Sequence, residues 1–101
     1  MRRAIESSDE ALAKDPFSFE VFPNPATDQL TIRLQSAEKT AGDIRIYDGM
    51  GKLVSTLPTE QLNEDQAKDI KMDTQGLSGG TYYIVIQTGE KKYVKSIVIT
   101  R

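Results

Sequence analysis

The segment Gly49-Met50-Gly51-Lys52 is the first place in the chain where reactive chemistry could be sought, because glycines followed by a lysine can bind phosphate. A working phosphate loop needs a longer glycine-rich stretch, a Ser or Thr after the lysine, and a helix whose N-terminus receives the phosphate. Here Leu53 follows the lysine, and the next residues alternate as in a strand. We therefore interpret this segment as a hairpin turn.

Carboxylates near predicted loops are the second chemical possibility. They are Asp43, Asp48, Glu60, Glu64, Asp65 and Asp73. None of them has the spacing of an EF-hand loop, although a calcium site built from distant loop carboxylates stays open. Glycoside hydrolysis needs two carboxyl groups roughly 5–10 Å apart in a substrate cleft, for which a thin domain leaves little room. Solvated surface charge is the better interpretation.

The residue types that are missing exclude several classes of function. The chain has no Cys and no His, so disulfides, thiol nucleophiles, Cys-type zinc sites and His-based proton transfer are excluded. We predict that the chain is not an enzyme and uses no cofactor and no metal. The net charge of −2, with both signs interspersed, argues against nucleic acid as the main partner. No apolar run approaches the ~20 residues of a spanning helix, so we predict no membrane insertion.

The chain divides by pattern at residue 17. Residues 1–16 are rich in Ala, Glu, Asp and Lys, and we interpret them as a linker or added segment with a short helix over 9–14. No signal peptide is visible there, so an exported protein would carry its signal further upstream. Residues 17–101 alternate apolar and polar side chains between turns, whereas 58–67 are polar and predicted as a loop. The predicted strands lie at 17–21, 30–34, 44–47, 52–57, 70–72, 82–87 and 92–100.

Seven short strands at turn spacings of about 10 residues predict an all-β, immunoglobulin-like antiparallel β-sandwich. One face of each strand should fill the space between the two sheets. The predicted core consists of Phe19, Val21, Leu30, Ile32, Ile44, Ile46, Ile70, Met72, Leu77, Tyr82, Ile84, Ile86, Ile97 and Ile99.

Two surface features suggest binding. One is a basic patch near the last hairpin, which would either protect an edge strand or dock a partner electrostatically; it comprises Lys91, Lys92, Lys95 and Arg101. The other is a set of aromatic residues that could line a carbohydrate-binding face, although packing against strand neighbours is the simpler interpretation; it comprises Tyr47, Tyr82, Tyr83 and Tyr93.

The order of the punctuating motifs is more specific than any one of them. Pro23-Asn24-Pro25 follows the first strand, Gly51-Lys52 follows the third, and Gly80 precedes Tyr82 in the sixth. The sequence closes on Lys95-Ser96-Ile97-Val98-Ile99. Over residues 19–101 this resembles the type A C-terminal sorting domain of the type IX (Por) secretion system.

The resemblance implies a function in export. Domains of this kind follow an N-terminal cargo domain, are recognised in the periplasm by translocon or shuttle proteins of the type IX system, and direct the cargo to the cell surface or the medium. A surface sortase cleaves upstream of the domain, which is an immunoglobulin-like sandwich of seven strands. Matched by position, the recognition residues are Pro23, Asn24, Pro25, Gly51, Lys52, Gly80, Tyr82, Lys95, Ile97, Val98 and Ile99.

Physical reasons can be given for several of these residues. The two prolines of the first motif fix an extended corner, and Gly51 and Gly80 permit turn geometry that a Cβ would strain. The last strand could offer unpaired backbone groups at a sheet edge to a partner. Two alternatives remain at this point: an accessory sandwich module that binds carbohydrate or protein, and a domain that forms a homodimer through an edge strand.

Overall fold

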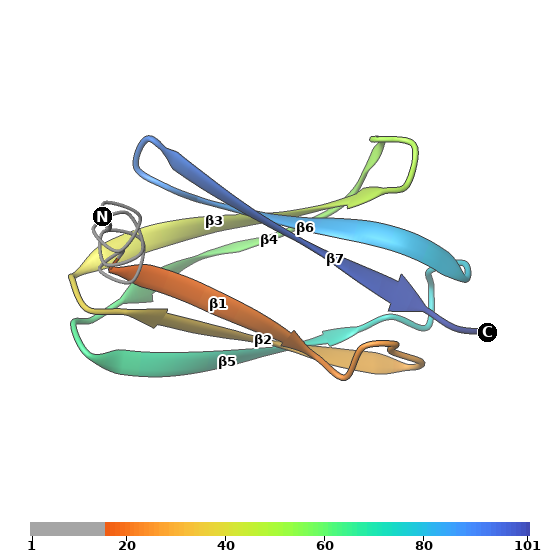
Figure 1. Cartoon of the computed structure of the whole chain (residues 1–101), viewed down its shortest axis with the longest axis horizontal. Coiled ribbons are helices and arrows are strands. Elements are labelled where there is room, and N and C mark those ends of the chain that lie inside the picture. The colour runs from red at the N-terminus through yellow and green to blue at the C-terminus, as the bar shows by residue number, and fades with distance from the viewer. Residues whose placement is uncertain (1–15) are drawn as a thin grey trace, which may run out of the picture.

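The fold consists of two antiparallel β-sheets, seen in a computed structural model that describes residues 16–101 (Figure 1). The predicted helix over 9–14 lies outside these residues. The described part holds no helix that could serve as an apolar membrane span. Seven strands occur in the expected order: β1 (Phe17–Phe22), β2 (Gln29–Ser36), β3 (Thr40–Asp48), β4 (Leu53–Leu62), β5 (Gln66–Asp73), β6 (Gly80–Thr88) and β7 (Lys91–Ile99).

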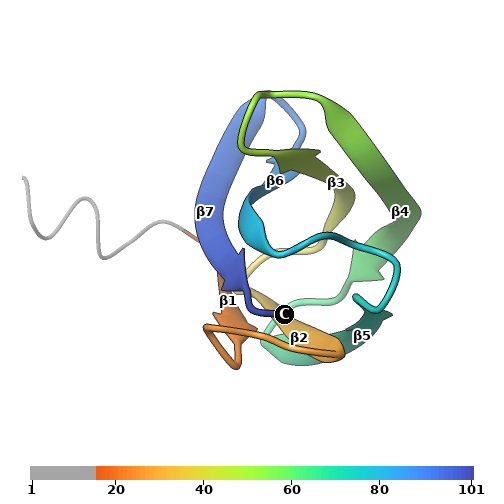
Figure 2. The same ribbon diagram turned by 90° about the vertical axis from the view of Figure 1, so that its right-hand side faces the viewer.

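The strands form a sheet of order β1-β2-β5 and a sheet of order β4-β3-β6-β7. The predicted sandwich is therefore confirmed, as are the β3–β4 and β6–β7 hairpins. Viewed from the end, the two sheets face each other across the core (Figure 2). The edge strands β1 and β7 meet at one side and β4 and β5 at the other, and we call these borders the β1–β7 seam and the β4–β5 seam.

The core lies between the sheets and follows the predicted alternation. Every predicted core residue is buried except Val21, Ile70 and Leu77, which are partly buried and pack against the rest. The prediction omitted four buried apolar residues. These are Phe17, Ala26, Leu34 and Leu62.

The predicted loop over 58–67 is wrong, because β4 continues to Leu62 and β5 begins at Gln66. The register shifts between Gly42 and Ile44, so that Pro58-Thr59 stands opposite Asp43 alone as a bulge. A proline and a bulge are tolerated here because β4 is an edge strand, whose outward backbone groups need no partner strand. Polar composition concealed a strand that has a buried side chain, Leu62, near its end.

Candidate functional site

Most of the predicted recognition residues lie at one end of the sandwich, although they come from distant parts of the sequence. Since the strands alternate in direction, the β1–β2 corner, the β3–β4 turn, the β5–β6 loop and the end of β7 all meet there (Figure 1). We call this the motif end and define it as residues 23–28, 49–52, 74–82 and 97–101. The structure thereby brings together every predicted recognition residue except Lys95.

The corner that contains Asn24 is bonded to the end of β7. The Asn24 Oδ1 atom accepts a hydrogen bond of 3.0 Å from the Val98 amide. The Ala26 amide donates to the Val98 carbonyl and the Thr100 amide donates to the Ala26 carbonyl, each at 2.8 Å, so Ala26 and Ile99 form a parallel bridge. Our expectation that the end of the last strand offers unpaired backbone groups is therefore wrong beyond Ser96, because the corner occupies them.

Arg101 bonds the loops of the motif end to one another. Its guanidinium donates from Nε to the Leu77 carbonyl at 2.9 Å and from one terminal nitrogen to the Thr27 carbonyl at 2.8 Å. The other terminal nitrogen donates to the Thr74 carbonyl, and Asp28 lies 3.4 Å from the guanidinium as an ion pair. The sequence alone suggested only a member of a basic patch, since nothing in it shows that these carbonyls converge.

Thr74 ties the β5–β6 loop to the corner and has no exposed surface. Its amide donates to the Asp28 carbonyl at 2.9 Å, and its hydroxyl donates to the Thr27 carbonyl at 2.6 Å. A buried hydroxyl needs such an acceptor, because leaving it unpaired costs about 1–3 kcal/mol. No sequence signal singled out this threonine, which stands in a polar turn.

Gly80 and Tyr82 fix the start of β6 beside the end of β7. Gly80 has a φ of 150°, which favours glycine, and it pairs with Ile99. Tyr82 is buried, and its hydroxyl donates to the Ser78 carbonyl at 2.7 Å. Both residues therefore shape the motif end from within, and neither presents a reactive group to solvent.

Gly51 and Lys52 lie in the β3–β4 turn. The Asp48 carboxylate accepts hydrogen bonds of 2.9 Å from the amides of Met50 and Lys52, and Gly51 has a φ of 88°. This is the predicted hairpin turn, with no helix to receive a phosphate. Lys52 is exposed and lines a shallow hollow together with Tyr82, so its side chain is accessible at the motif end.

Comparison with known proteins identifies the family to which the chain belongs. The model of the secretion system C-terminal sorting domain family matches residues 20–100, which is most of the chain. The chain belongs to this family. No curated protein matches the chain at a significant level.

Solved structures support the fold of this sorting domain. A crystal structure of dimeric latent PorU from Porphyromonas gingivalis matches with a TM-score of 0.66 and 20% identity, over 83% of this chain and 9% of that one. The matching region is therefore a small part of the PorU chain. A β-glucosidase from Erythrobacter marinus matches with a TM-score of 0.44 and 10% identity, over 83% of this chain and 16% of that one, which is too distant to carry an argument.

Lys95 is the recognition residue that lies apart from the motif end. It pairs with Ile84 in the middle of β7, so its side chain starts on the inner face of the sheet. From there it reaches into the β1–β7 seam, where its ammonium lies 5.8 Å from the centre of the Phe19 ring. The predicted single basic patch is wrong, because Lys91 and Ile99 stand roughly 26 Å apart at opposite ends of β7 and Arg101 lies beyond Ile99.

The tyrosines of the sorting domain do not share one face. Tyr82 is buried, and Tyr93 is partly buried and packs on Phe17 with ring centroids 4.7 Å apart. Only Tyr47 and Tyr83 adjoin each other, as partners in the β3–β6 register, on the outer face of the larger sheet. The aromatic face on which the carbohydrate alternative rested is therefore not formed.

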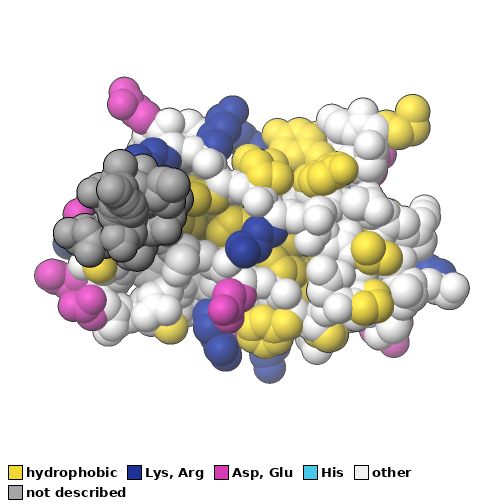
Figure 3. Space-filling model, in the orientation of Figure 1, with side chains coloured by type: hydrophobic (Ala, Val, Ile, Leu, Met, Phe, Trp, Pro, Cys, Tyr) yellow, Lys and Arg dark blue, Asp and Glu magenta, His cyan; other side chains and the backbone are white. Residues whose placement is uncertain are grey.

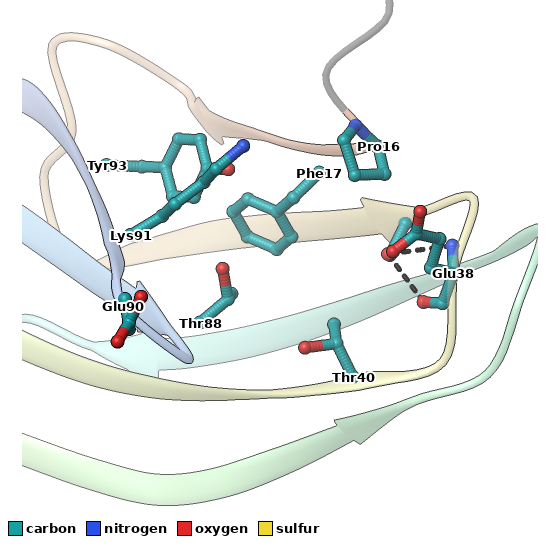
Figure 4. Close-up of a pocket in the computed structure, with 9 residues that line it drawn as sticks. Pro16, Phe17, Glu38, Thr40, Thr88, Glu90, Lys91 and Tyr93 are labelled. Carbon is teal, nitrogen blue, oxygen red and sulfur yellow. Dashed lines mark hydrogen bonds between the residues drawn. The ribbon is translucent and has the colours of Figure 1, made fainter.

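The opposite end of the domain holds a hollow of about 290 Å³ between Phe17 and the β6–β7 hairpin (Figure 4). This volume is at the lower limit of small-molecule pockets. The Ser36 hydroxyl there donates to the Glu38 carbonyl at 2.6 Å, so it is not directed at a ligand. Within residues 16–101 there is also no group of three or more acidic side chains placed to hold a metal ion.

One ion pair of the sorting domain shifts the pKa values of both of its residues. Arg33 on β2 donates to both oxygens of Asp69 on β5, at 2.8 and 2.9 Å, across the register of the smaller sheet. The hydrogen bond from Arg33 lowers the pKa of Asp69, and the same bond raises the pKa of Arg33. Both side chains are exposed, so this pair is a surface contact rather than a reactive centre.

Proposed function

We propose that residues 17–101 target an N-terminal cargo domain to the type IX translocon for transport across the outer membrane. The family match over residues 20–100 carries this proposal. In it, translocon or shuttle proteins bind the folded domain in the periplasm, and the cargo arrives at the cell surface or in the medium. Residues 1–16 act as the linker in which a surface sortase cleaves.

Recognition in this proposal depends on the shape of the motif end. The corner at Asn24 is hydrogen-bonded to the end of β7, whereas the turn at Lys52 is held by its own bond to Asp48 and borders a hollow that it shares with the β5–β6 loop. These parts of one surface come together only after folding. A partner that reads this surface would reject an unfolded chain, so export would report on folding. Catalysis has no part in this function.

Point variants test the proposal better than truncation. Deleting residues 97–101 removes Ile97 and Ile99, which are 1% and 2% exposed, so the loss of export would also follow from loss of the core. Lys52→Ala leaves its backbone bonds intact and removes an exposed charge. A matched control is Lys39→Ala, an exposed lysine in the β2–β3 connection, at the opposite end of the sandwich from the motif end.

The measurement is the fraction of a fluorescent cargo that reaches the surface of a bacterium with a type IX system, when the cargo is fused before Met1. We expect surface display with the unaltered chain and with Lys39→Ala, and a fall of about ten-fold with Lys52→Ala, the effect of losing ~1.4 kcal/mol of binding. Retention of the unaltered fusion in the periplasm would contradict the proposed function.

A homodimer through an edge strand is the second candidate. It is favoured by the place of β7 at the edge of the larger sheet. Sedimentation of the 101-residue chain at high concentration tests it, and a species of monomer mass alone would reject it.

A further inference from the structure

The four edge strands of the sandwich differ in how well they could accept another strand. β4 carries Pro58 and a bulge, and β1 is confined to six residues between Pro16 and Pro23. β5 has neither feature, but its Lys68 side chain bonds Gln61 and Glu60 of β4 and so links this edge to the other sheet. Proline and bulges are two of the devices by which natural sheets prevent edge-to-edge pairing, and charged side chains are a third. β7 runs for nine residues with neither proline nor bulge, and its pairing with β6 has no register shift. Its lysines oppose a basic or apolar partner strand but favour an acidic one.

Alternation along β7 shows which backbone groups face away from β6. The Val98 amide and carbonyl point to the corner, since they bond Asn24 and Ala26. In an antiparallel pair the direction repeats every second residue, so the amides and carbonyls of Val94 and Ser96 point the same way. Within the described part of the chain, the corner bonds no residue of β7 before Val98. The stretch Lys92–Ser96 therefore presents its outward backbone groups at the β1–β7 seam.

The two seams of the sandwich are each crossed by a lysine from an inward-facing strand position. Lys68 crosses the β4–β5 seam, where its ammonium bonds the Gln61 carbonyl at 3.0 Å and the Glu60 carboxylate at 3.2 Å. That seam is thereby closed by a neutralised contact. Lys68 therefore serves as the comparison for Lys95, the lysine at the equivalent place in the other seam.

Lys95 in the β1–β7 seam has no such partner. Its one contact is the face of the Phe19 ring, and no carboxylate among residues 16–101 lies within ion-pair distance of it. Glu20 lines the same hollow but remains beyond that distance. Figure 3 views this side of the molecule, where charged side chains sit between apolar groups. An uncompensated ammonium thus stands beside an open row of backbone groups.

We propose that the β1–β7 seam binds an extended acidic segment of a partner protein, which adds as a strand to β7 at Lys92–Ser96 and places a carboxylate beside Lys95. The inference rests on the proposed function, since the partner belongs to the export machinery. Strand addition supplies main-chain hydrogen bonds, and pockets for alternate side chains supply specificity. The added strand also covers Val94, which is 57% exposed.

The decisive variant is Val94→Pro. Because the Val94 amide points away from β6, proline at this position removes a donor needed by an added strand while keeping the β6–β7 ladder. We expect the melting temperature to stay within about 4 °C of the unaltered chain and surface display of the fused cargo to fall about ten-fold or more. Val94→Thr keeps the amide and should be exported normally. Ser96→Pro repeats the test at the next outward amide.

The lysine pair separates recognition from stability. Lys95→Met should lower surface display several-fold and leave the melting temperature nearly unchanged, since within residues 16–101 the ammonium pairs with no carboxylate and only stands over the Phe19 ring, which a methionine can still contact. Lys68→Met should lower the melting temperature slightly, because it breaks the bonds to Gln61 and Glu60, and should leave display near normal.

Four outcomes would overturn the inference. Normal export of both proline variants in folded form would show that the seam is not the docking site, while export of the unaltered chain would leave the proposed function standing. Unfolding of both variants would show that these amides bond within the domain. Equal effects of Lys95→Met and Lys68→Met on display would show that the Lys95 ammonium has no specific part in binding the partner. A dimer of the 101-residue chain that Val94→Pro dissociates would make a second copy the occupant.

Discussion

The bonding of Arg101 allows a sharp test of how the motif end is held together. Arg101→Met keeps most of the aliphatic length and removes the three guanidinium hydrogen bonds to the carbonyls of Thr27, Thr74 and Leu77. Two of these carbonyls retain another donor, because the Thr74 hydroxyl bonds Thr27 and the Leu77 amide bonds Thr74. The Leu77 carbonyl is the one left to water.

The magnitude follows from this inventory. A hydrogen bond to a charged group contributes about 1.5–3 kcal/mol when well formed. The Arg101 side chain is 31% exposed and water can replace it at Leu77, so we expect a loss of about 1.5–2 kcal/mol in the free energy of unfolding for the whole contact. For a domain of this size, 1 kcal/mol shifts the melting temperature by about 4–8 °C, which gives a decrease of about 10 °C.

The assay is thermal and urea unfolding of the 101-residue chain followed by circular dichroism. The melting temperature of Arg101→Lys should lie between those of the unaltered chain and Arg101→Met, since an ammonium lacks the planar set of donors with which the guanidinium reaches three carbonyls. Arg45→Met, on the outer face of β3, is the control and should change little. If Arg101→Met melted within about 2 °C of the unaltered chain, the reasoning that this guanidinium holds the loops together would be refuted.

Three further predictions test the core, a backbone position and the surface ion pair. Leu34→Ala should cost about 2–5 kcal/mol in urea unfolding because Leu34 has no exposed surface, whereas Leu53→Ala, at 46% exposure, should cost under about 0.5 kcal/mol. Gly80→Ala meets no atom within 4 Å but adopts a φ of 150°, so we expect a loss of about 1–3 kcal/mol from backbone strain alone. The pKa of Asp69 is lowered by its hydrogen bond from Arg33, so the stabilisation from this carboxylate is present above the pKa of an unfolded Asp and is lost as the pH falls through the lower folded value. The melting temperatures of Asp69→Asn and of the unaltered chain should therefore differ near neutral pH and converge in acid, and a difference that persisted in strong acid would contradict this assignment.

Export variants must be interpreted against these stability measurements. Ile97 and Ile99 belong to the core, while Val98 and Lys95 face the corner and the seam. A terminal signal defined by deletion therefore combines residues that hold the fold with residues that a partner could touch. Variants that keep the melting temperature are the ones that report on recognition.

Local pattern was enough to predict the class of fold. Alternating side chains have a period of two only in strands, and the turns at Asp48–Gly51 and Thr88–Glu90 carry glycines that accept positive φ, so strand number and both hairpins could be predicted. The same logic failed at 58–62, because an edge strand with a bulge is bound to a neighbour on one side only and need not alternate. The family could also be predicted from the order of its motifs.

The sequence by itself determined seven strands, their inward faces and the family motifs, since each of these depends on neighbours within about ten residues. Only the tertiary structure decided that Asn24 would bond Val98, that Arg101 would bond three loop carbonyls, and that Lys95 would stand unpaired in a seam while Lys68 would not. These facts depend on which sheet edges come together and in which register. No local period encodes contacts such as those of Asn24 with Val98 and of Arg101 with Thr27, in which the two residues are 74 positions apart.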